Sequence, residues 1–421
     1  MDGICMNIAV IGGGIAGLSA AYLLQPHHQV TLYEKEQVPG GHSRTCHVAT
    51  PDGRIAVDTG FIVFNRRNYP QLSALFQHLQ VPVVASAMSF GVSIDQGRLE
   101  YSTRSLLGLF AQPANLLRRT HWRLLRDILR FNRQARSYLA QHPSASLAEC
   151  LSDLQFSAAF QDDYLLAMSG AIWSTPAEQV RQMPASTLIR FFDNHGLLTV
   201  NDQPQWYTVR GGSQIYVQHL TATLRDLRCD QRVTQVVRTP QGVNVICADG
   251  ECCLYDQVIL ACHTDQSLRL LAAPTPAEQA VLGHIRYQPN HVILHSDTRF
   301  MPRRRHAWSS WVYLSDQTDR SSGVSLTYWM NNLQPLNTRQ PMLVTLNPAR
   351  EPDPALTHDQ HMFEHPLLDA NAIAAQARLP EIQGQDRLWY CGAWQGYGFH
   401  EDGLRSAVAV ATRLGARIPW A

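Results

Sequence analysis

A glycine-rich segment near the start of the sequence constrains the fold more than any other stretch. The short apolar run Asn7–Ile11 is rich in β-branched residues, as buried parallel strands are. Directly after it, Gly12, Gly14 and Gly17 satisfy the pattern G-x-G-x-x-G, and residues 18–24 are good helix formers. In a strand-turn-helix unit these glycines allow a tight turn, a close approach of backbone to a pyrophosphate and close helix packing. The segment therefore predicts a dinucleotide site, with the pyrophosphate at the N-terminus of the helix.

An acidic residue lies at the distance that such a site requires. Gln29–Tyr33 has the composition of a second strand, and Glu34 follows it, twenty residues after Gly14. A carboxylate at this position accepts hydrogen bonds from the ribose hydroxyls. The glycine pattern alone is also compatible with an ordinary turn, but its setting between two strands and a helix favours the dinucleotide site. The neighbouring residues expected to contact the cofactor are Ile15, Ala16 and Lys35.

A second glycine pair follows, in a pattern that a nicotinamide site does not need. The sequence reads GGHSRT over residues 40–45 and VDTGF over residues 57–61. A Gly-Gly-x-x-Arg loop followed by an Asp-x-Gly strand resembles the flavin amine oxidase superfamily, which includes monoamine and polyamine oxidases, protoporphyrinogen oxidase and carotenoid desaturases. The resemblance implies that FAD is the cofactor. Because a flavin-linking cysteine motif is absent, we expect non-covalent FAD.

The resemblance also implies individual contacts. In that superfamily the arginine meets the FAD pyrophosphate, which implies Arg44 here, and a guanidinium can bind phosphate oxygens bidentately. The Asp-x-Gly strand passes beside the isoalloxazine, and a strand after the segment TVRGGSQIYVQHL (residues 208–220) brings Val236 to the adenine. We expect His42 to contact phosphate or ribose rather than to react. The remaining residues implied at the cofactor are Gly41, Ser43, Thr59, Gly60, Phe61, Ile62, Gly392, Asp402, Gly403 and Leu404.

The length predicts more than one domain, because 421 residues exceed what a single hydrophobic core usually serves. We expect an α/β fold: a Rossmann-like FAD-binding domain of the amine oxidase type, with an α+β substrate (cap) domain inserted. The FAD-binding domain would comprise residues 1–70, 206–285 and 385–421, and the cap residues 71–205 and 286–384. The first insert is helical in pattern. The second contains strands, among them GVSLTYWM (residues 323–330), where Trp329 is expected to face an apolar substrate cavity unless it fills the cap's own core.

The single lysine of the chain bears on the chemistry. Many amine oxidases of the superfamily place a lysine, through a water, against flavin N5, whereas Lys35 stands beside the ribose-binding Glu34. The motifs GGHSRT, VDTGFIVFN, TYWMNNLQ and CGAWQGYGFHEDG resemble, over essentially the whole chain, a bacterial branch described as predicted NAD/FAD-binding proteins. Members of that branch are often associated with cyclopropane fatty-acid synthase-like enzymes, which implies a lipid or fatty-acyl substrate.

The leading hypothesis that follows is an FAD-dependent oxidoreductase. It would oxidise or desaturate an apolar, fatty-acyl or lipid-like small molecule by hydride transfer to flavin N5. Three alternatives stay open: a non-redox double-bond isomerase of a fatty acid, an amine oxidase lacking the N5 lysine, and a binding protein in which FAD is structural.

The segment CGAWQGYGFHEDGLRSA (residues 391–407) supplies the candidate catalytic residues. His400 and Glu401 precede the Asp-Gly pair that opens the last helix, and a histidine near neutral pKa can transfer a proton as a C–H bond breaks. Alternatively, both residues only hold backbone and flavin carbonyls in place. Trp394 and Tyr397 are expected to border the substrate.

Charge and cysteines exclude several classes of protein. With 35 basic and 34 acidic residues the net charge is +1, so we expect no nucleic-acid partner. The nine cysteines include no Cys-x-x-Cys pair, and we expect no metal site. The first residues do not resemble a signal peptide, and no apolar run is long enough to span a membrane, so a cytoplasmic location is expected.

One stretch is locally basic. Between Leu116 and Tyr138 arginines recur at steps of three and four, with Asp127 as the sole acid. Such a helix can lie at the inner face of an anionic membrane, meet an anionic substrate head group, or simply be a solvated outer face. Whether chains associate into oligomers is left open. The arginines are Arg118, Arg119, Arg123, Arg126, Arg130, Arg133 and Arg136.

Overall fold

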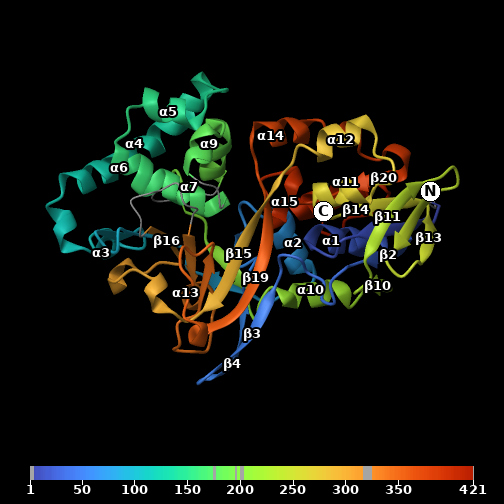
Figure 1. The fold of residues 1–421 in the computed structure, drawn as a ribbon, viewed down its shortest axis with the longest axis horizontal. Coiled ribbons are helices and arrows are strands. Elements are labelled where there is room, and N and C mark those ends of the chain that lie inside the picture. The colour runs from blue at the N-terminus through green and yellow to red at the C-terminus, as the bar shows by residue number, and fades with distance from the viewer. Residues whose placement is uncertain (1–3, 174–176, 195–196, 200–202, 316–324, 421) are drawn as a thin grey trace.

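The computed structural model describes residues 4–173, 177–194, 197–199, 203–315 and 325–420. Figure 1 shows a parallel sheet with its helices at one end of the molecule and a layer of helices at the other, with the long strands β15 and β19 between them. Both termini lie at the end that holds the parallel sheet.

The parallel sheet has the strand order β10-β2-β1-β14-β20, and all four pairings are parallel. Its strands alternate between two cores: Ile8 and Val10 point into one, and Ala9 and Ile11 into the other. This period of two is what an extended strand covered on both faces requires. The strands are β1 (Asn7–Ile11), β2 (Gln29–Tyr33), β10 (Asp226–Arg228), β14 (Gln257–Leu260) and β20 (Leu388–Tyr390).

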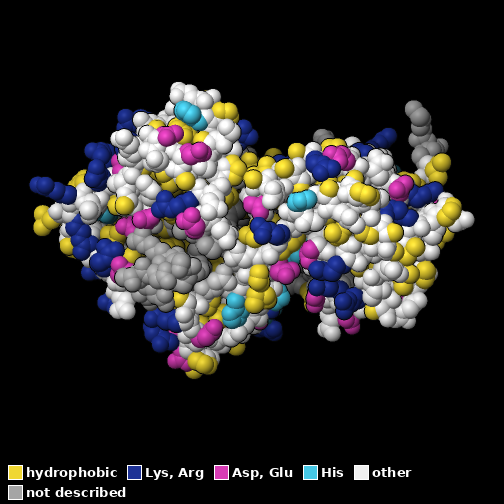
Figure 2. Space-filling model, turned by 45° about the horizontal axis from the view of Figure 1, so that its top comes forward, with side chains coloured by type: hydrophobic (Ala, Val, Ile, Leu, Met, Phe, Trp, Pro, Cys, Tyr) yellow, Lys and Arg dark blue, Asp and Glu magenta, His cyan; other side chains and the backbone are white. Residues whose placement is uncertain are grey.

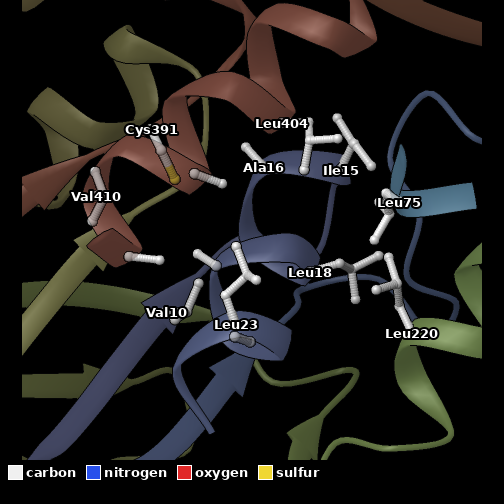
Figure 3. Packing of buried hydrophobic residues seen from close by; sticks show 14 of the residues in the cluster. Val10, Ile15, Ala16, Leu18, Leu23, Leu75, Leu220, Cys391, Leu404 and Val410 are labelled. Atoms are coloured by element: carbon white, nitrogen blue, oxygen red, sulfur yellow. The ribbon is translucent and has the colours of Figure 1, made fainter. Parts of the chain in front are cut away.

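Helices from distant parts of the chain cover one face of this sheet. Figure 3 shows α1 and α15 meeting there, with Ala16 and Ile15 beside Leu404. Close packing at the start of α1 requires glycine, because a Cβ at Gly17 would come within 1.8 Å of the Gly12 carbonyl oxygen. The helices of this core are α1 (Ile15–Leu24), α2 (Pro70–His78), α10 (Gln214–Thr221) and α15 (His400–Arg413).

The opposite face is covered by three more helices and a small antiparallel sheet of order β11-β12-β13. These elements are β11 (Val233–Arg238), β12 (Val243–Cys247), β13 (Cys252–Tyr255), α11 (Thr264–Leu270), α12 (Pro276–Leu282) and α14 (Ala370–Ala377).

A mixed seven-stranded sheet of order β19-β15-β18-β17-β16-β7-β8 connects the two ends of the molecule. Neighbouring strands are antiparallel except β16 and β7, which are parallel. Its strands are β7 (Phe90–Ile94), β8 (Leu99–Ser102), β15 (Tyr287–His295), β16 (Trp311–Ser315), β17 (Ser325–Trp329), β18 (Leu343–Leu346) and β19 (Thr357–Pro366). Two smaller sheets pair β3 (Thr45–Thr50) with β4 (Gly53–Asp58), and β9 (Trp206–Val209) with β5 (Phe64–Asn65) and β6 (Val83–Ser86).

The helical layer packs on β7, β8 and β17 through one apolar core. In its longest member, α4, the buried residues recur at helical spacing and form one face, which includes Leu124, Phe131 and Tyr138. The helices are α3 (Leu106–Leu109), η1 (Pro113–Leu116), α4 (Arg119–Gln141), α5 (Leu147–Asp153), α6 (Ala158–Phe160), η2 (Gln161–Leu165), α7 (Leu166–Trp173), α8 (Ala177–Gln182) and α9 (Ala185–Asn194). None of the described helices is both long and apolar enough to cross a bilayer.

The predicted α/β architecture, a parallel sheet with a second α+β part, is confirmed, but several elements differ from the sequence-based expectation. The parallel sheet draws its strands from residues 1–70, 206–285 and 385–421. However, α2 and α14 pack into the two cores of that sheet instead of the cap, because their apolar faces fit there. The first insert also contributes strands to the cap sheet, and the last helix begins at His400, two residues before the expected start. Residues 323–324 of the expected strand lie outside the described residues.

Candidate functional site

The first glycine loop leaves the start of α1 open. Gly14 has extended backbone angles (φ −77°, ψ −176°), and a Cβ built on it would meet nothing within 4 Å. No side chain caps the helix, so the N–H groups of its first turn are directed at this space. Ile15, Ala16 and Gly17 form that first turn and are buried. An anionic group is what such a helix start favours.

Glu34 lies at the end of β2, where the dinucleotide pattern requires it. Its carboxylate accepts hydrogen bonds from the backbone N–H groups of Gly13 and Glu36 at 2.7 and 2.9 Å. These bonds fix the carboxylate against the loop. The side chain of Lys35 is 58% exposed, and its Nζ lies 3.7 Å from a carboxylate oxygen of Glu36. Its contact with the cofactor stays a prediction.

The second glycine loop packs directly on the first. The N–H of Gly40 donates to the Gly13 carbonyl at 2.8 Å, and a Cβ on Gly41 would lie 3.3 Å from the Gly14 Cα. The Asp-x-Gly strand then joins them, because the N–H of Phe61 donates to the carbonyl of His42 at 2.7 Å. A Cβ on Gly60 would clash with that carbonyl at 2.1 Å. Thr59 continues the pairing, its N–H donating to the Arg44 carbonyl, and Ile62 is buried beyond it.

Arg44 forms a bidentate ion pair with Asp359 of β19. Its two terminal nitrogens lie 2.6 and 3.1 Å from the Asp359 carboxylate oxygens, and one of them also donates to Thr59. This pair raises the pKa of Arg44. The contact with the pyrophosphate stays a prediction, and it requires Arg44 to share its donors with Asp359.

Val236 does not lie beside Glu34. Its carbonyl accepts the N–H of Ala272 at 3.0 Å, on the side of α11, whereas Gln231 donates its N–H to the Glu34 carbonyl at 2.9 Å. Since a strand advances about 3.3 Å per residue, Val236 lies well beyond that point. The adenine contact of Val236 stays a prediction, and Gln231 is the residue of this segment that bonds Glu34.

Asp58 is a buried hub that the sequence pattern did not single out as a site residue. It accepts hydrogen bonds from the Thr45 hydroxyl at 2.6 Å, from the Ser213 N–H at 2.8 Å and from the Gln334 amide at 2.8 Å. Burial raises the pKa of Asp58 to about 6, against the opposing effect of these donors. Asp58 thus ties the loop of residues 40–45 to the GGS turn that begins α10.

His42 carries a polar atom without a partner. Its ring stacks on Phe363 with centroids 4.6 Å apart and lies 5.3 Å from the ring of His365, both on β19. Its Nε2 is shielded from solvent and has no hydrogen-bond partner. Burial, followed by the neighbouring His365, lowers the pKa of His42 well below its usual range. His42 is therefore neutral, and its Nε2 is a buried polar atom that the protein itself leaves unsatisfied.

The C-terminal segment closes the site around Gly392 and Asp402. The N–H of Gly392 donates to the Ser406 hydroxyl at 2.8 Å. Asp402 accepts the N–H groups of Tyr397 and Phe399 at 2.9 and 3.1 Å and so fixes the loop before α15. In the first turns of α15, Gly403 and Leu404 are buried, with Gly403 close to Ile15 and Ala16 of α1.

His400, at the start of the last helix, contacts residues from the second glycine loop, the Asp-x-Gly segment and α10. Its Nε2 lies 2.9 Å from the Ser43 hydroxyl and 3.1 Å from the Tyr216 hydroxyl, and the two hydroxyls are themselves hydrogen-bonded. Its ring stacks on Phe61. Burial lowers the pKa of His400 to about 3, so the ring is neutral at physiological pH. Tyr216, which sequence reasoning missed, completes this cluster from α10.

Glu401 faces a different part of the molecule. Its two carboxylate oxygens accept the backbone N–H groups of Gln71 and Leu72, at 2.9 and 3.0 Å, in the first turn of α2. These are the donors that a helix start leaves unsatisfied. Both oxygens are thus engaged, which favours the structural alternative for Glu401 over catalysis.

The three expected substrate residues lie in three different places. Tyr397 is partly buried against the core of the helical layer, as a residue bordering the substrate would be. Trp329 lies on the opposite face of β17 from Tyr328 and packs against Trp308, which favours the alternative that it fills the cap's own core. Trp394 is buried in the core of the parallel sheet, with an unpartnered Nε1 beside Gly392, and its place at the substrate stays a prediction.

Comparison with known proteins identifies the family. The family model described as flavin containing amine oxidoreductase matches residues 15–352, and the chain belongs to this family. A comparison with curated proteins finds no match. The protein is a flavin-dependent oxidoreductase with FAD as its cofactor.

Solved structures share the fold along their whole length. A CLA-producing fatty acid isomerase from P. acnes is 15% identical with a TM-score of 0.68, covering 97% of this chain and 98% of that chain. Putrescine oxidase bound to putrescine is 15% identical with a TM-score of 0.68, covering 98% and 100%. A putative protoporphyrinogen oxidase from Exiguobacterium sp. is 13% identical with a TM-score of 0.66, covering 97% and 98%. At these identities the likeness concerns the fold.

The residues present fit FAD. The open start of α1 and the carboxylate of Glu34 suit its pyrophosphate and ribose. The unpartnered nitrogens of His42 and Trp394 are polar atoms that a bound group would satisfy. We therefore assign these four features to holding the cofactor.

Proposed function

We propose that the protein oxidises or desaturates an apolar, fatty-acyl or lipid-like substrate. FAD, when bound, supplies the capacity to accept a hydride. The side chains of the protein bind and orient the substrate and exclude water.

Aromatic side chains at the junction between the helical layer and the cofactor end carry the proposal. Trp311 and Tyr328 form an edge-to-face pair with centroids 5.4 Å apart and contact both the helical-layer core and the core under β15 and β18. Phe399 packs against the helical-layer core and against the core that contains α1. All three are only partly buried, so they present apolar surface where the two parts of the molecule meet. Such a lining suits a hydrocarbon chain better than a charged amine.

Three buried carboxylates at the cofactor end are already committed. Asp58 accepts backbone and side-chain donors, Glu401 accepts two backbone N–H groups, and Asp402 accepts two backbone N–H groups and an arginine. An ammonium substrate would need one of them released, and binding it would then cost the bonds that are lost. The exposed position of Lys35 likewise gives no support to an amine oxidase that uses a lysine at N5.

A fatty-acid double-bond isomerase is the second candidate. The likeness to the fatty acid isomerase from P. acnes favours it as a member of the same fold with an acyl substrate. In that reaction the substrate regains the hydride that it gave up, so no electron acceptor is consumed.

Anaerobic mixing of the FAD-loaded protein with candidate substrates tests the proposal. We expect unsaturated fatty acids or their acyl derivatives to bleach the visible flavin absorbance lastingly. Bleaching that recovers without oxygen indicates the isomerase, and bleaching by putrescine or other amines but not by acyl compounds contradicts the proposal.

We also infer a cytoplasmic location. All nine cysteines are free, which a reducing compartment permits. Labelling of these thiols in intact cells, compared with lysates, tests the inference: protection from a membrane-impermeant reagent in intact cells is expected.

A further inference from the structure

We propose that the end of the molecule formed by α3, η1 and residues 119–133 of α4 docks on the surface of an anionic lipid bilayer. We call this surface the docking face. Its apolar members are Leu106, Leu107, Leu116, Leu117, Trp122 and Leu129, and its basic members are Arg104, Arg119, Arg123 and Arg133. The proposal goes beyond the proposed reaction and does not depend on the substrate.

Exposed apolar side chains concentrate on the docking face. Eleven large hydrophobic side chains among the described residues are strongly exposed, and six of them fall within residues 106–129. Leu117 is 89% exposed, Leu106 77% and Leu107 71%. Isolated exposed leucines are ordinary, but this clustering is not, because a contiguous apolar patch marks an interaction surface.

Direct contacts make the docking face continuous. The ring of Phe110, at the end of α3, lies 5.3 Å from the ring of Trp122. The indole N–H of Trp122 donates to the carbonyl of Leu116 at 2.9 Å. Leu129 follows Trp122 by seven residues, two turns along the same face of α4. The segments 106–117 and 119–129 thus present their exposed side chains together.

The charge of the docking face is of one sign. Asp127 is the only acid between residues 104 and 141, and it is buried and paired with Arg130 at 3.0 Å. Among the ion pairs between described residues, none involves Arg119, Arg123 or Arg133, and all three are exposed. Figure 2 shows basic side chains, with hydrophobic ones among them, gathered at the end of the molecule that the helical layer forms.

An anionic bilayer is the partner that matches both the exposed apolar side chains and the positive charge of the docking face. Leucine side chains gain free energy by entering the acyl boundary, and unpaired arginines are attracted to acidic head groups by about 1 kcal/mol each. An indole with its N–H directed at the protein backbone suits the interface between the two regions. A merely solvated face would explain the arginines but not the exposed leucines.

Flotation of the full FAD-loaded protein with vesicles tests the proposal. We expect binding to vesicles of mixed phosphatidylcholine and phosphatidylglycerol, weakened by added salt, and little binding to phosphatidylcholine alone. Two triple variants should each bind the vesicles at least about tenfold more weakly than the wild type. The first replaces leucines (Leu106→Ser, Leu107→Ser, Leu117→Ser), and the second replaces arginines (Arg119→Gln, Arg123→Gln, Arg133→Gln).

Matched substitutions at other exposed positions provide the controls. Two control variants remove the same kinds of side chain from other surfaces and should bind vesicles as the wild type does. The first combines Leu254→Ser with Leu356→Ser, and the second combines Arg54→Gln, Arg225→Gln and Arg417→Gln. As a second readout, brominated lipid should quench tryptophan emission less in Trp122→Phe than in the wild type.

Three outcomes overturn the proposal. The first is a wild-type protein that does not bind anionic vesicles, and the second is binding that the docking-face variants retain. The third is a wild-type dimer that the leucine variant converts to a monomer without a change in vesicle binding, since the surface is then an interface between copies of the chain.

Discussion

The rings of His400 and Phe61 stack with their centroids 3.9 Å apart and their planes at 18°. This contact joins the last helix of the chain to the Asp-x-Gly segment near its start. Together with the hydrogen bonds to Ser43 and Tyr216, it holds a neutral imidazole in a fixed position.

Replacing His400 should therefore lower the stability of the protein and its affinity for FAD, and leave the pH profile of turnover unchanged. We expect His400→Ala to lower stability and FAD affinity, by about 1–3 kcal/mol for the unsatisfied hydroxyls it leaves behind. His400→Gln, which keeps a polar group near them, should recover part of the loss. Thermal unfolding, FAD titration and the pH profile of turnover measure these effects. A limb of the pH profile that disappears in His400→Gln would show that His400 itself transfers the proton.

Glu401→Ala should reduce stability more than turnover. It leaves the N–H groups of Gln71 and Leu72 unsatisfied at the start of α2, which we expect to cost about 1–2 kcal/mol. Denaturant unfolding gives the stability, and the turnover of the remaining folded enzyme should fall by no more than a few fold. Glu381→Ala, at an exposed carboxylate, is the control and should change little. Loss of turnover with unchanged stability would restore Glu401 as a catalytic candidate.

Gly14→Ala should separate folding from cofactor binding. The extended backbone of Gly14 accommodates alanine, and the new methyl group meets no protein atom within 4 Å, so apoprotein stability should change by less than about 0.5 kcal/mol. The methyl group would occupy the space assigned to the pyrophosphate, and FAD affinity should fall at least about tenfold, or 1.4 kcal/mol. Titration of apoprotein with FAD measures it. Gly17→Ala, which collides with the Gly12 carbonyl, should instead destabilise the apoprotein. Unchanged FAD affinity in Gly14→Ala would exclude this loop as the pyrophosphate site.

Acidification should destabilise the protein through its buried histidines. Burial lowers the pKa of His295 and of His365 to about 4, and that of His400 to about 3, whereas an unfolded histidine titrates near 6.5. Between these values the unfolded chain binds more protons, so stability falls as pH drops below about 6.5, by up to about 1.4 kcal/mol per pH unit for each group. Asp58 opposes this trend: its raised pKa means that its own contribution increases as pH falls through about 6.

His295 offers a direct test of this pH dependence. Its Nδ1 accepts the Asp297 N–H at 3.1 Å, which an imidazolium cannot do, and its Nε2 lies 2.7 Å from the Thr345 hydroxyl. Denaturant unfolding at several pH values between about 4.5 and 7 gives the free energy of unfolding as a function of pH. This free energy should fall less steeply with decreasing pH in His295→Gln than in the wild type. An identical slope would mean that His295 is not among the groups responsible.

The sequence predicted the parts of the fold that local pattern controls. The strand-turn-helix start and the acidic residue after β2 follow from periodicity and glycine spacing. The return of residues 385–421 to the parallel sheet was implied by the resemblance to the flavin amine oxidase superfamily.

What the sequence could not predict depends on contacts between distant residues. Glu401 bonds backbone atoms 330 and 329 positions away, and Arg44 pairs with Asp359 across 315 positions. Neither partner belongs to a motif. The side of the sheet on which Trp329 lies was open for another reason: neighbouring residues of a strand face opposite ways, and only the packing shows that Tyr328 contacts the helical-layer core while Trp329 packs against Trp308.

The most direct test of the proposed function is anaerobic stopped-flow absorbance of the FAD-loaded protein after mixing with an unsaturated fatty acid or, separately, with putrescine. Our account predicts that the visible flavin band is bleached by the fatty acid and stays bleached until oxygen is admitted, while putrescine leaves it unchanged. Bleaching by putrescine alone would contradict it.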